Sequence, residues 1–272
     1  MNPRSTSRKH KVIAARTLRS VKAIAASERT GAGDILLGMA LTFIAGAINA
    51  GGFLAVGQYT SHMSGVFSSM ADNLALGSLT LVGLGLAAFV PFVAGAASSA
   101  MLINWGRRHR LGSRYAMPLM VEAALLCVFG TLGWMAHPSP SFAGGAIPLL
   151  CFIMGLQNAT VTKISGARMR TTHVTGIVTD IGIELGKLVY WNRNRHIDGM
   201  VLADRAKLRL LVMLLSSFFI GGVTGAIGFS HLGFLFSLPF ALLLVVLAGP
   251  ALVEDMLGHV LHRAHLHSSG ER

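Results

Sequence analysis

The sequence predicts an all-α protein that crosses a membrane several times. Of its 272 residues, 53% are hydrophobic and only 12% are charged, and the mean hydropathy is +0.61. Soluble domains carry about 25% charged residues, and disordered chains are poor in apolar ones. The apolar runs are continuous rather than alternating, which favours transmembrane helices over a β-barrel. The remaining class is a polytopic helical membrane protein.

Six apolar segments have the ~20 residues that a helix needs to cross a membrane. We expect these spans at about 35–57, 79–103, 115–136, 143–162, 210–229 and 232–253. They divide the chain into a basic N-terminal tail (1–34), a first membrane repeat (35–136), a linker (137–142), a second membrane repeat (143–255) with an insertion near 188–207, and a His-rich tail (256–272). Each repeat therefore contains three predicted spans.

The positions of the basic residues predict the orientation of the chain. All 23 Lys and Arg lie in the two tails or in the segments 104–114 and 163–209, and none lies in the other connections. Basic residues remain on the cytoplasmic side of a membrane, so we expect both termini in the cytoplasm of a protein in the cell inner (plasma) membrane. The net charge of +12 is explained by these loops. The expected partners are the lipid bilayer, a small-molecule substrate and a second copy in a homo-oligomer, with no nucleic acid.

Neither cysteine nor the C-terminal histidines indicate a cofactor. Cys127 and Cys151 both lie in apolar runs without Cys-x-x-Cys spacing, which argues against a disulfide framework or a zinc knuckle. Residues His259, His262 and His265 are three apart, which suits a metal site on a helix. A solvated tail is the simpler interpretation, and we expect no cofactor.

One sequence motif occurs twice. The first copy reads Gly46-Ala-Ile-Asn49-Ala50 followed by Thr60-Ser-His62-Met-Ser64-Gly65, and the second reads Gly155-Leu-Gln-Asn158-Ala159 followed by Thr171-Thr-His173-Val-Thr175-Gly176. The spacing from Asn to His is 13 residues in the first copy and 15 in the second. Three spans in each half would invert the second half relative to the first. Inverted repeats are typical of secondary transporters.

The segments that follow the motif, 60–78 and 171–190, are too polar for ordinary spans. On a helix His173, Asp180 and Glu184 would share one face, and His62, Ser69 and Asn73 occupy the matching positions, with Asp72 beside them. Two interpretations remain open. The segments are either amphipathic helices at the membrane interface or re-entrant helices that line a central site, with unwound backbone near Gly65 and Gly176 and helix N-termini suited to an anion.

Three polar residues inside the predicted spans also have two interpretations each. Asn49 and Asn158 either join neighbouring helices or contact a substrate. Glu122 lies in an apolar run and is either a proton carrier or a headgroup-level residue, because Arg114 is only two turns away.

The motifs make the chain resemble the YoaK-like family of bacterial multi-pass membrane proteins, a domain of unknown function, over about residues 35–255. The resemblance is carried by residues 45–53 and 60–65 in the first copy and by 155–159 and 171–176 in the second. The family commonly has Asp at the position of Asn49 and Asn at the position of Val66. The resemblance implies a six-span bacterial inner-membrane protein without an established reaction.

The function we expect is that of a small-molecule secondary transporter. The candidate substrate-binding residues are Asn49, Thr60, His62, Ser64, Gly65, Asn158, Thr171, His173, Thr175 and Gly176. The candidates for proton or ion coupling are Asp72, Glu122, Asp180 and Glu184.

A membrane-embedded metal-dependent enzyme is the alternative, in which His62, His173, Asp72 and Asp180 would hold a metal with an activated water. The sequence contains no His-Glu-x-x-His or nucleophile motif, which makes an enzyme the less favoured interpretation. An accessory or scaffold protein would leave the polar repeat without a role.

Overall fold

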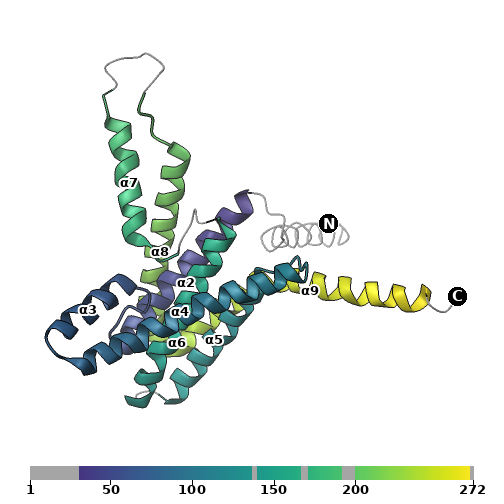
Figure 1. The fold of residues 1–272 in the computed structure, drawn as a ribbon, viewed down its shortest axis with the longest axis horizontal. Helices are drawn as coiled ribbons and strands as arrows, with labels where there is room; N and C mark the ends of the chain where they lie inside the picture. Colours follow the sequence, from purple (N-terminus) through teal and green to yellow (C-terminus); the bar gives the residue numbers. More distant parts are fainter. Residues whose placement is uncertain (1–30, 137–139, 167–170, 192–199, 270–272) are drawn as a thin grey trace, which may run out of the picture.

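The computed structural model describes residues 31–136, 140–166, 171–191 and 200–269, and within these ranges the chain forms helices and no strands (Figure 1). The helices are α2 (Gly31–Val56), α3 (Met63–Ala75), α4 (Leu79–Arg108), α5 (Ala116–Ala136), α6 (Pro140–Ile164), α7 (Val174–Val189), α8 (Arg205–Leu232), the 3-10 turn η1 (Gly233–Phe236) and α9 (Ser237–Ser269). The side chains of the C-terminal histidines, most of the basic tail and residues 192–199 of the insertion lie outside the described residues.

Five stretches of the described chain are long and apolar enough to cross a membrane: Ile35–Leu54, Leu79–Arg108, Ala116–Ala136, Gly144–Ile164 and Arg205–Val253. They indicate a multi-pass membrane protein. The last stretch contains α8, η1 and the apolar part of α9, where the sequence predicts two separate spans. Gly233 ends α8 with a φ of 61°, a left-handed conformation that favours glycine. The count of six spans stays a prediction.

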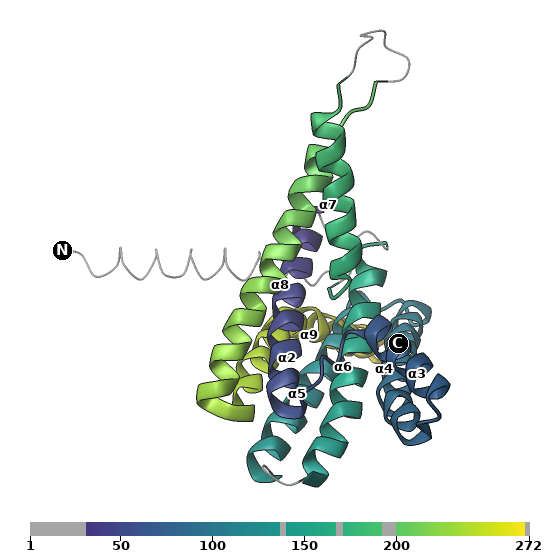
Figure 2. The same ribbon diagram turned by 90° about the vertical axis from the view of Figure 1, so that its left-hand side faces the viewer.

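The long helices pair between the two halves of the chain. Helix α2 packs on α8, α4 packs on α6, and α5 packs on α9, so each pair joins a helix before residue 137 to a helix after it. Figures 1 and 2 show the resulting bundle, and in Figure 1 the last turns of α9 extend away from it. Its core consists of fully buried apolar side chains, among them Leu41, Ile44, Leu126, Leu150 and Ile153.

The α4–α6 crossing depends on two glycines. A Cβ atom on Gly95 would lie against the carbonyl oxygen of Phe152, and a Cβ on Gly155 would lie against that of Phe92, both far inside contact distance. Small residues let helix backbones approach closely in membranes. Each helix therefore contributes the sequence Phe-x-x-Gly, and its glycine faces the phenylalanine backbone of its partner.

The α2–α8 crossing has the same construction. A Cβ on Gly46 would meet the carbonyl oxygen of Phe218, and a Cβ on Gly221 would meet that of Phe43. Phe-x-x-Gly thus occurs in α2, α4, α6 and α8, and it places the same two residue types at both crossings.

Two shorter helices each form a hairpin with the long helix that follows. Helix α3 lies against the first half of α4, where the ring of Phe67 is 5.7 Å from that of Phe89. Helix α7 lies against the first half of α8, and this hairpin projects from the bundle at the top of Figures 1 and 2. The N-termini of α3 and α7 are the ends that point back toward the bundle, and there the repeated motifs are found.

Candidate functional site

Asn158 holds the chain that enters α7. Its Oδ1 accepts hydrogen bonds from the hydroxyl groups of Thr171 and Thr172, each at 3.1 Å, and from the backbone N–H of Thr172 at 3.4 Å. Its Nδ2 donates to the Met154 carbonyl oxygen at 2.9 Å and lies 2.7 Å from the Thr172 hydroxyl. The amide therefore fixes the residues just before α7 against α6.

Asn49 has the same role in the first half. Its Oδ1 accepts from the hydroxyl of Ser61 at 2.9 Å and from the backbone N–H of Ser61 at 3.3 Å. Ser61 and Thr172 occupy the same place in the two motifs, one residue before the histidine. Both asparagines thus support the packing interpretation, although they also face the cavity described below.

These bonds set the depth at which α3 and α7 begin. Helix α2 runs seven residues beyond Asn49 to Val56, about 10 Å at 1.5 Å per residue. Because Ser61 is hydrogen-bonded to Asn49, the chain that follows α2 runs back alongside it by about 10 Å before α3 begins. Asn158 lies six residues before the end of α6, about 9 Å, so α7 starts in the same way. Both helices begin level with the interior of an apolar stretch.

A histidine precedes each of these helices and lies over its first turn. His62 and His173 are the N-cap residues of α3 and α7, and neither side chain accepts a hydrogen bond from its helix. A Cβ on Gly65 would collide with the His62 ring, and a Cβ on Gly176 would collide with the His173 ring. The motif glycines therefore make room for the histidines. Both glycines are helical, and the non-helical backbone near them lies in the residues before each helix, 57–62 and 171–173.

The two motifs meet at one cavity of about 940 Å³, which we call the central cavity. Matching residues of the two halves line it in six pairs: Asn49 with Asn158, Ser61 with Thr172, His62 with His173, Met63 with Val174, Ser64 with Thr175, and Phe92 with Phe218. The rest of the lining is Tyr59, Ala96, Gly155, Ala159, Thr162 and Lys163. Residues more than 100 positions apart in the sequence thus form one site.

The charge of this lining is one-sided. Lys163 contributes a cation, and none of the lining residues is Asp or Glu. The N-termini of α3 and α7 both open on the cavity without a side-chain cap, and a helix N-terminus carries about half a positive charge. The central cavity therefore favours a negatively charged or strongly polar guest.

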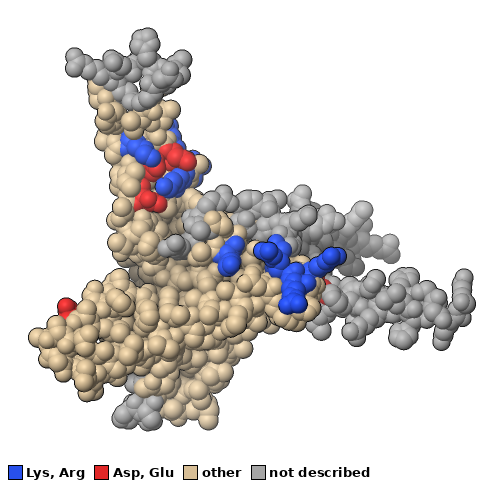
Figure 3. All heavy atoms as spheres, in the orientation of Figure 1, with Lys and Arg blue, Asp and Glu red and all other residues tan. Residues whose placement is uncertain are grey.

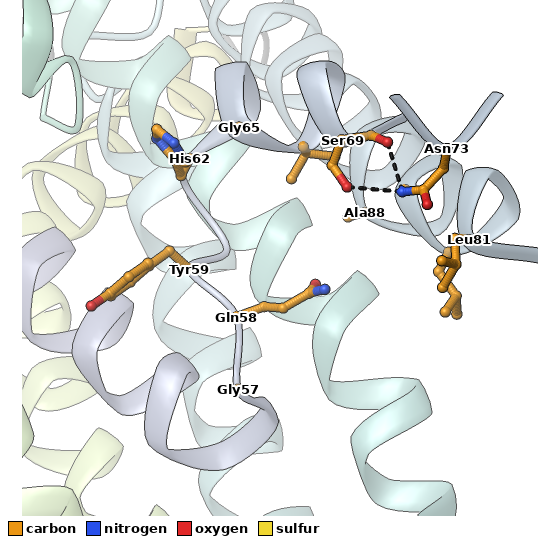
Figure 4. A pocket seen from close by; sticks show the side chains of 12 residues that line it. Gly57, Gln58, Tyr59, His62, Gly65, Ser69, Asn73, Leu81 and Ala88 are labelled. Carbon is orange, nitrogen blue, oxygen red and sulfur yellow. Dashed lines mark hydrogen bonds between the residues drawn. The ribbon is translucent and has the colours of Figure 1, made fainter. Parts of the chain in front are cut away.

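A second cavity of about 460 Å³, the lateral cavity, lies between the turn after α2, α3 and α4. His62 and Tyr59 line both cavities. In Figure 4 the Gln58 side chain points into the lateral cavity, and Asn73 is bonded to Ser69 along α3, at 3.1 Å from its hydroxyl. The polar face of α3 that the sequence predicts is thus largely a cavity wall.

The corresponding face of α7 is closed by ion pairs. Glu184, only 1% exposed, accepts from the Lys187 ammonium at 2.9 Å and from the Asp204 backbone N–H at 2.9 Å. Lys207 of α8 lies 3.4 Å from Asp180 and 3.9 Å from Glu184. These hydrogen bonds and the nearby ammonium groups hold the pKa of Glu184 below its usual value. These ion pairs and hydrogen bonds connect the C-terminal half of α7 to the start of α8.

The other two candidates for proton or ion coupling lie apart from both cavities. Asp72 is exposed on α3. Glu122 of α5 is fully buried, and the Gln157 amide donates to it at 2.8 Å. Of the four acidic residues that sequence analysis selected, none lines the central cavity. Their roles in coupling stay predictions.

The candidate substrate-binding residues divide between the cavity wall and its support. Asn49, His62, Ser64, Asn158, His173 and Thr175 line the central cavity, whereas Thr60, Gly65, Thr171 and Gly176 do not. Thr60 and Thr171 are buried, and the Thr171 hydroxyl is bonded to Asn158.

Sequence reasoning missed Lys163 and the phenylalanines of the cavity wall. The signal for Phe92 and Phe218 was the repeated Phe-x-x-Gly. The sequence carries no comparable signal for Lys163.

A metal centre finds no support in this geometry. Within the described ranges, no three His, Cys, Asp or Glu side chains come together in a way that could hold a metal ion. The sequence-based alternative would need Asp180 beside the histidines, but Asp180 pairs with Lys207 instead.

Long apolar helices around one cavity, lined by residues of two matching motifs, define the class as a multi-pass helical membrane protein. The chain belongs to the family described as protein of unknown function DUF1275, which matches residues 37–249. The narrower YoaK-like name stays a prediction. No curated protein and no solved structure matches the chain.

Proposed function

We propose that this protein is a secondary transporter that binds a small anion in the central cavity. The observation that carries this proposal is the pairing of matched residues, His62 with His173 and Asn49 with Asn158, around one cavity. A site shared by two repeats, with the ends of broken helices directed at it, is the usual arrangement in secondary transporters. Substrate anions there bind at helix N-termini.

The proposal includes an inverted repeat and cytoplasmic termini. Three helix pairs join the halves reciprocally, and the halves use the same Phe-x-x-Gly contacts at the α2–α8 and α4–α6 crossings. Figure 3 shows Lys and Arg side chains over the α7–α8 hairpin and near the far end of α4, and none over α3 in this view. This distribution supports a cytoplasmic position for the α7–α8 hairpin and an external one for α3.

Sided thiol labelling tests the inverted repeat. In a background with Cys127→Ala and Cys151→Ala, single cysteines replace Leu76 at the end of α3 and Tyr190 at the end of α7, both well exposed. A membrane-impermeant maleimide should label Leu76→Cys only from outside and Tyr190→Cys only from the cytoplasm. His109→Cys, in the basic segment after α4, marks the cytoplasmic side. Labelling of Leu76→Cys and Tyr190→Cys from the same side would refute the inverted repeat.

Protection from labelling tests the anion site. Thr175→Cys places a thiol in the central cavity, and Tyr190→Cys serves as the control outside it. Sodium phosphate, sulfate, nitrate and acetate are compared at constant ionic strength with ammonium and choline gluconate. We expect at least one small anion to slow the labelling of Thr175→Cys without affecting Tyr190→Cys. Protection by the cations alone, or by none of these ions, would contradict the anion site.

A further inference from the structure

Glu122 and Gln157 form an isolated polar pair in the apolar core. Both side chains are fully buried, one on α5 and the other on α6. Gln157 Nε2 donates to Glu122 Oε1 at 2.8 Å. The other two oxygens of the pair, Glu122 Oε2 and Gln157 Oε1, are buried and have no hydrogen-bond partner in the described part of the chain.

No cation in the described structure compensates a charge on Glu122. Helix α5 packs against α4, α6, α9 and η1. The ionisable groups nearest in sequence on these elements, on α5 and in the turn before it are Arg107 and Arg108 of α4, Arg114 just before α5, Cys127 of α5, Cys151 and Lys163 of α6, and Asp255 of α9. None of them forms a recorded ion pair or hydrogen bond with Glu122. The Arg114 guanidinium lies over the Tyr115 ring, 5.1 Å from its centroid. Asp255 instead accepts from the backbone N–H groups of Gly112 and Ser113.

Counting donors and acceptors identifies what completes the pair. An ionised Glu122 would leave two buried oxygens unpaired and a charge without a counter-ion, which is costly in an apolar interior. One proton on Oε2 would turn that oxygen into a donor, and Gln157 Oε1 is the acceptor that lacks one. A carboxylic acid and a primary amide can bond through two parallel hydrogen bonds. A proton on Oε2 would therefore give a partner to both oxygens of the pair that lack one.

We propose that Glu122 and Gln157 are a proton-binding site, occupied in this conformation, whose occupancy is coupled to the central cavity. The coupling element is α6, because Gln157 immediately precedes Asn158 in the sequence. Asn158 lines the cavity and holds the entrance to α7. A rotation or shift of α6 that moves Asn158 would also move Gln157 away from Glu122, and an unpaired Glu122 that gains access to water would release its proton.

The coupling rests on the proposed transport function, whereas the proton site itself does not. In the transport cycle, the proton would be taken up in one orientation of the central cavity and released in the other. The chemistry is a reversible transfer of one proton between the Glu122 carboxyl group and water. It requires no other reactant.

Infrared difference spectroscopy tests the proton site directly. We expect purified protein at neutral pH to show the carbonyl stretching band of a protonated carboxylic acid, and Glu122→Gln to lack it. Glu184→Gln removes an ionised carboxylate and should leave the band unchanged. Gln157→Leu removes the donor to Oε1 and should shift the band to higher frequency. If no such band disappears in Glu122→Gln, the carboxyl group is ionised and the proposal is refuted.

Labelling rates as a function of pH test the coupling. With Thr175→Cys as the reporter, one coupled proton can change the labelling rate by up to about tenfold per pH unit. The labelling rate of Tyr190→Cys gives the pH dependence of the thiol itself. We expect the labelling rate of Thr175→Cys to depend more steeply on pH than this, and we expect Glu122→Gln to abolish the excess. An excess that persists in Glu122→Gln, or no excess at all, would overturn the coupling. Anion protection of Thr175→Cys is measured in a separate experiment, so a failure of the transport proposal can be distinguished from a failure of the proton coupling.

Discussion

Removing either motif asparagine should loosen the helix entrance that it holds, and the two losses should differ in size. Asn158 connects to three groups before α7, namely two hydroxyls and one backbone N–H, whereas Asn49 connects to only two groups of Ser61. Side-chain hydrogen bonds in membrane proteins average about 0.6 kcal/mol each. Asn158→Ala also leaves the buried Thr171 hydroxyl unpaired, which costs about 1 kcal/mol or more.

These contributions predict a local destabilisation of about 2–3 kcal/mol for Asn158→Ala and about 1 kcal/mol for Asn49→Ala. Hydrogen–deuterium exchange measures local opening directly. The amides of residues 171–177 should exchange roughly 30- to 150-fold faster in Asn158→Ala, and those of residues 60–66 about fivefold faster in Asn49→Ala. Asn158→Asp retains the accepting oxygen and should have a smaller effect. Equal effects at the two sites, or faster exchange spread over all helices, would refute the reasoning.

Two further predictions concern helix packing and pH. Gly155→Ala should lower the stability of the fold by about 1–3 kcal/mol, because the added methyl group meets the Phe92 backbone. Gly182→Ala, which faces open space on α7, should stabilise the fold by about 0.5–1 kcal/mol. Thermal unfolding in detergent measures both variants, and the opposite ranking would contradict the packing at the α4–α6 crossing. Since the folded-state pKa of Glu184 is lowered, its stabilisation is complete above the usual glutamate pKa of about 4.3 and is lost as the pH falls through the lower folded value. Between about pH 3 and 6, the melting temperature should therefore change less with pH for Glu184→Gln than for wild type. An identical pH dependence would show that the ion pairs of Glu184 contribute nothing to stability.

The sequence predicted the helices and the repeated motif because both depend on local pattern. Continuous apolar runs produce helices in a membrane, and the two Asn–His motifs are recognisable without any knowledge of their partners. The repeat matched His62 with His173, and both are N-cap residues that line the central cavity. It also selected Asn49 and Asn158, which support the site and line it at once.

The rest of the site depends on contacts between distant segments. His173, Asp180 and Glu184 share a helical face in sequence, but Lys207 of α8 determines that the two acids face an ion pair. Lys163 reaches the central cavity only because α6 ends beside the entrance to α7. Gly65 and Gly176 suggested irregular backbone from sequence, whereas their structural role is to accommodate a histidine ring. Such packing details follow from the fold and not from local periodicity.

The reciprocal pairing of helices has a consequence for biosynthesis. Helices α2 and α4 leave the ribosome first, but their main partners, α8 and α6, belong to the second half of the chain. Gly46 and Gly95 would then face lipid until those partners are inserted. The nascent first half thus lacks the contacts that define its final arrangement, and assembly of the bundle must wait for the last helices. A chain truncated before α6 should remain a set of inserted but unassembled helices, vulnerable to membrane proteases.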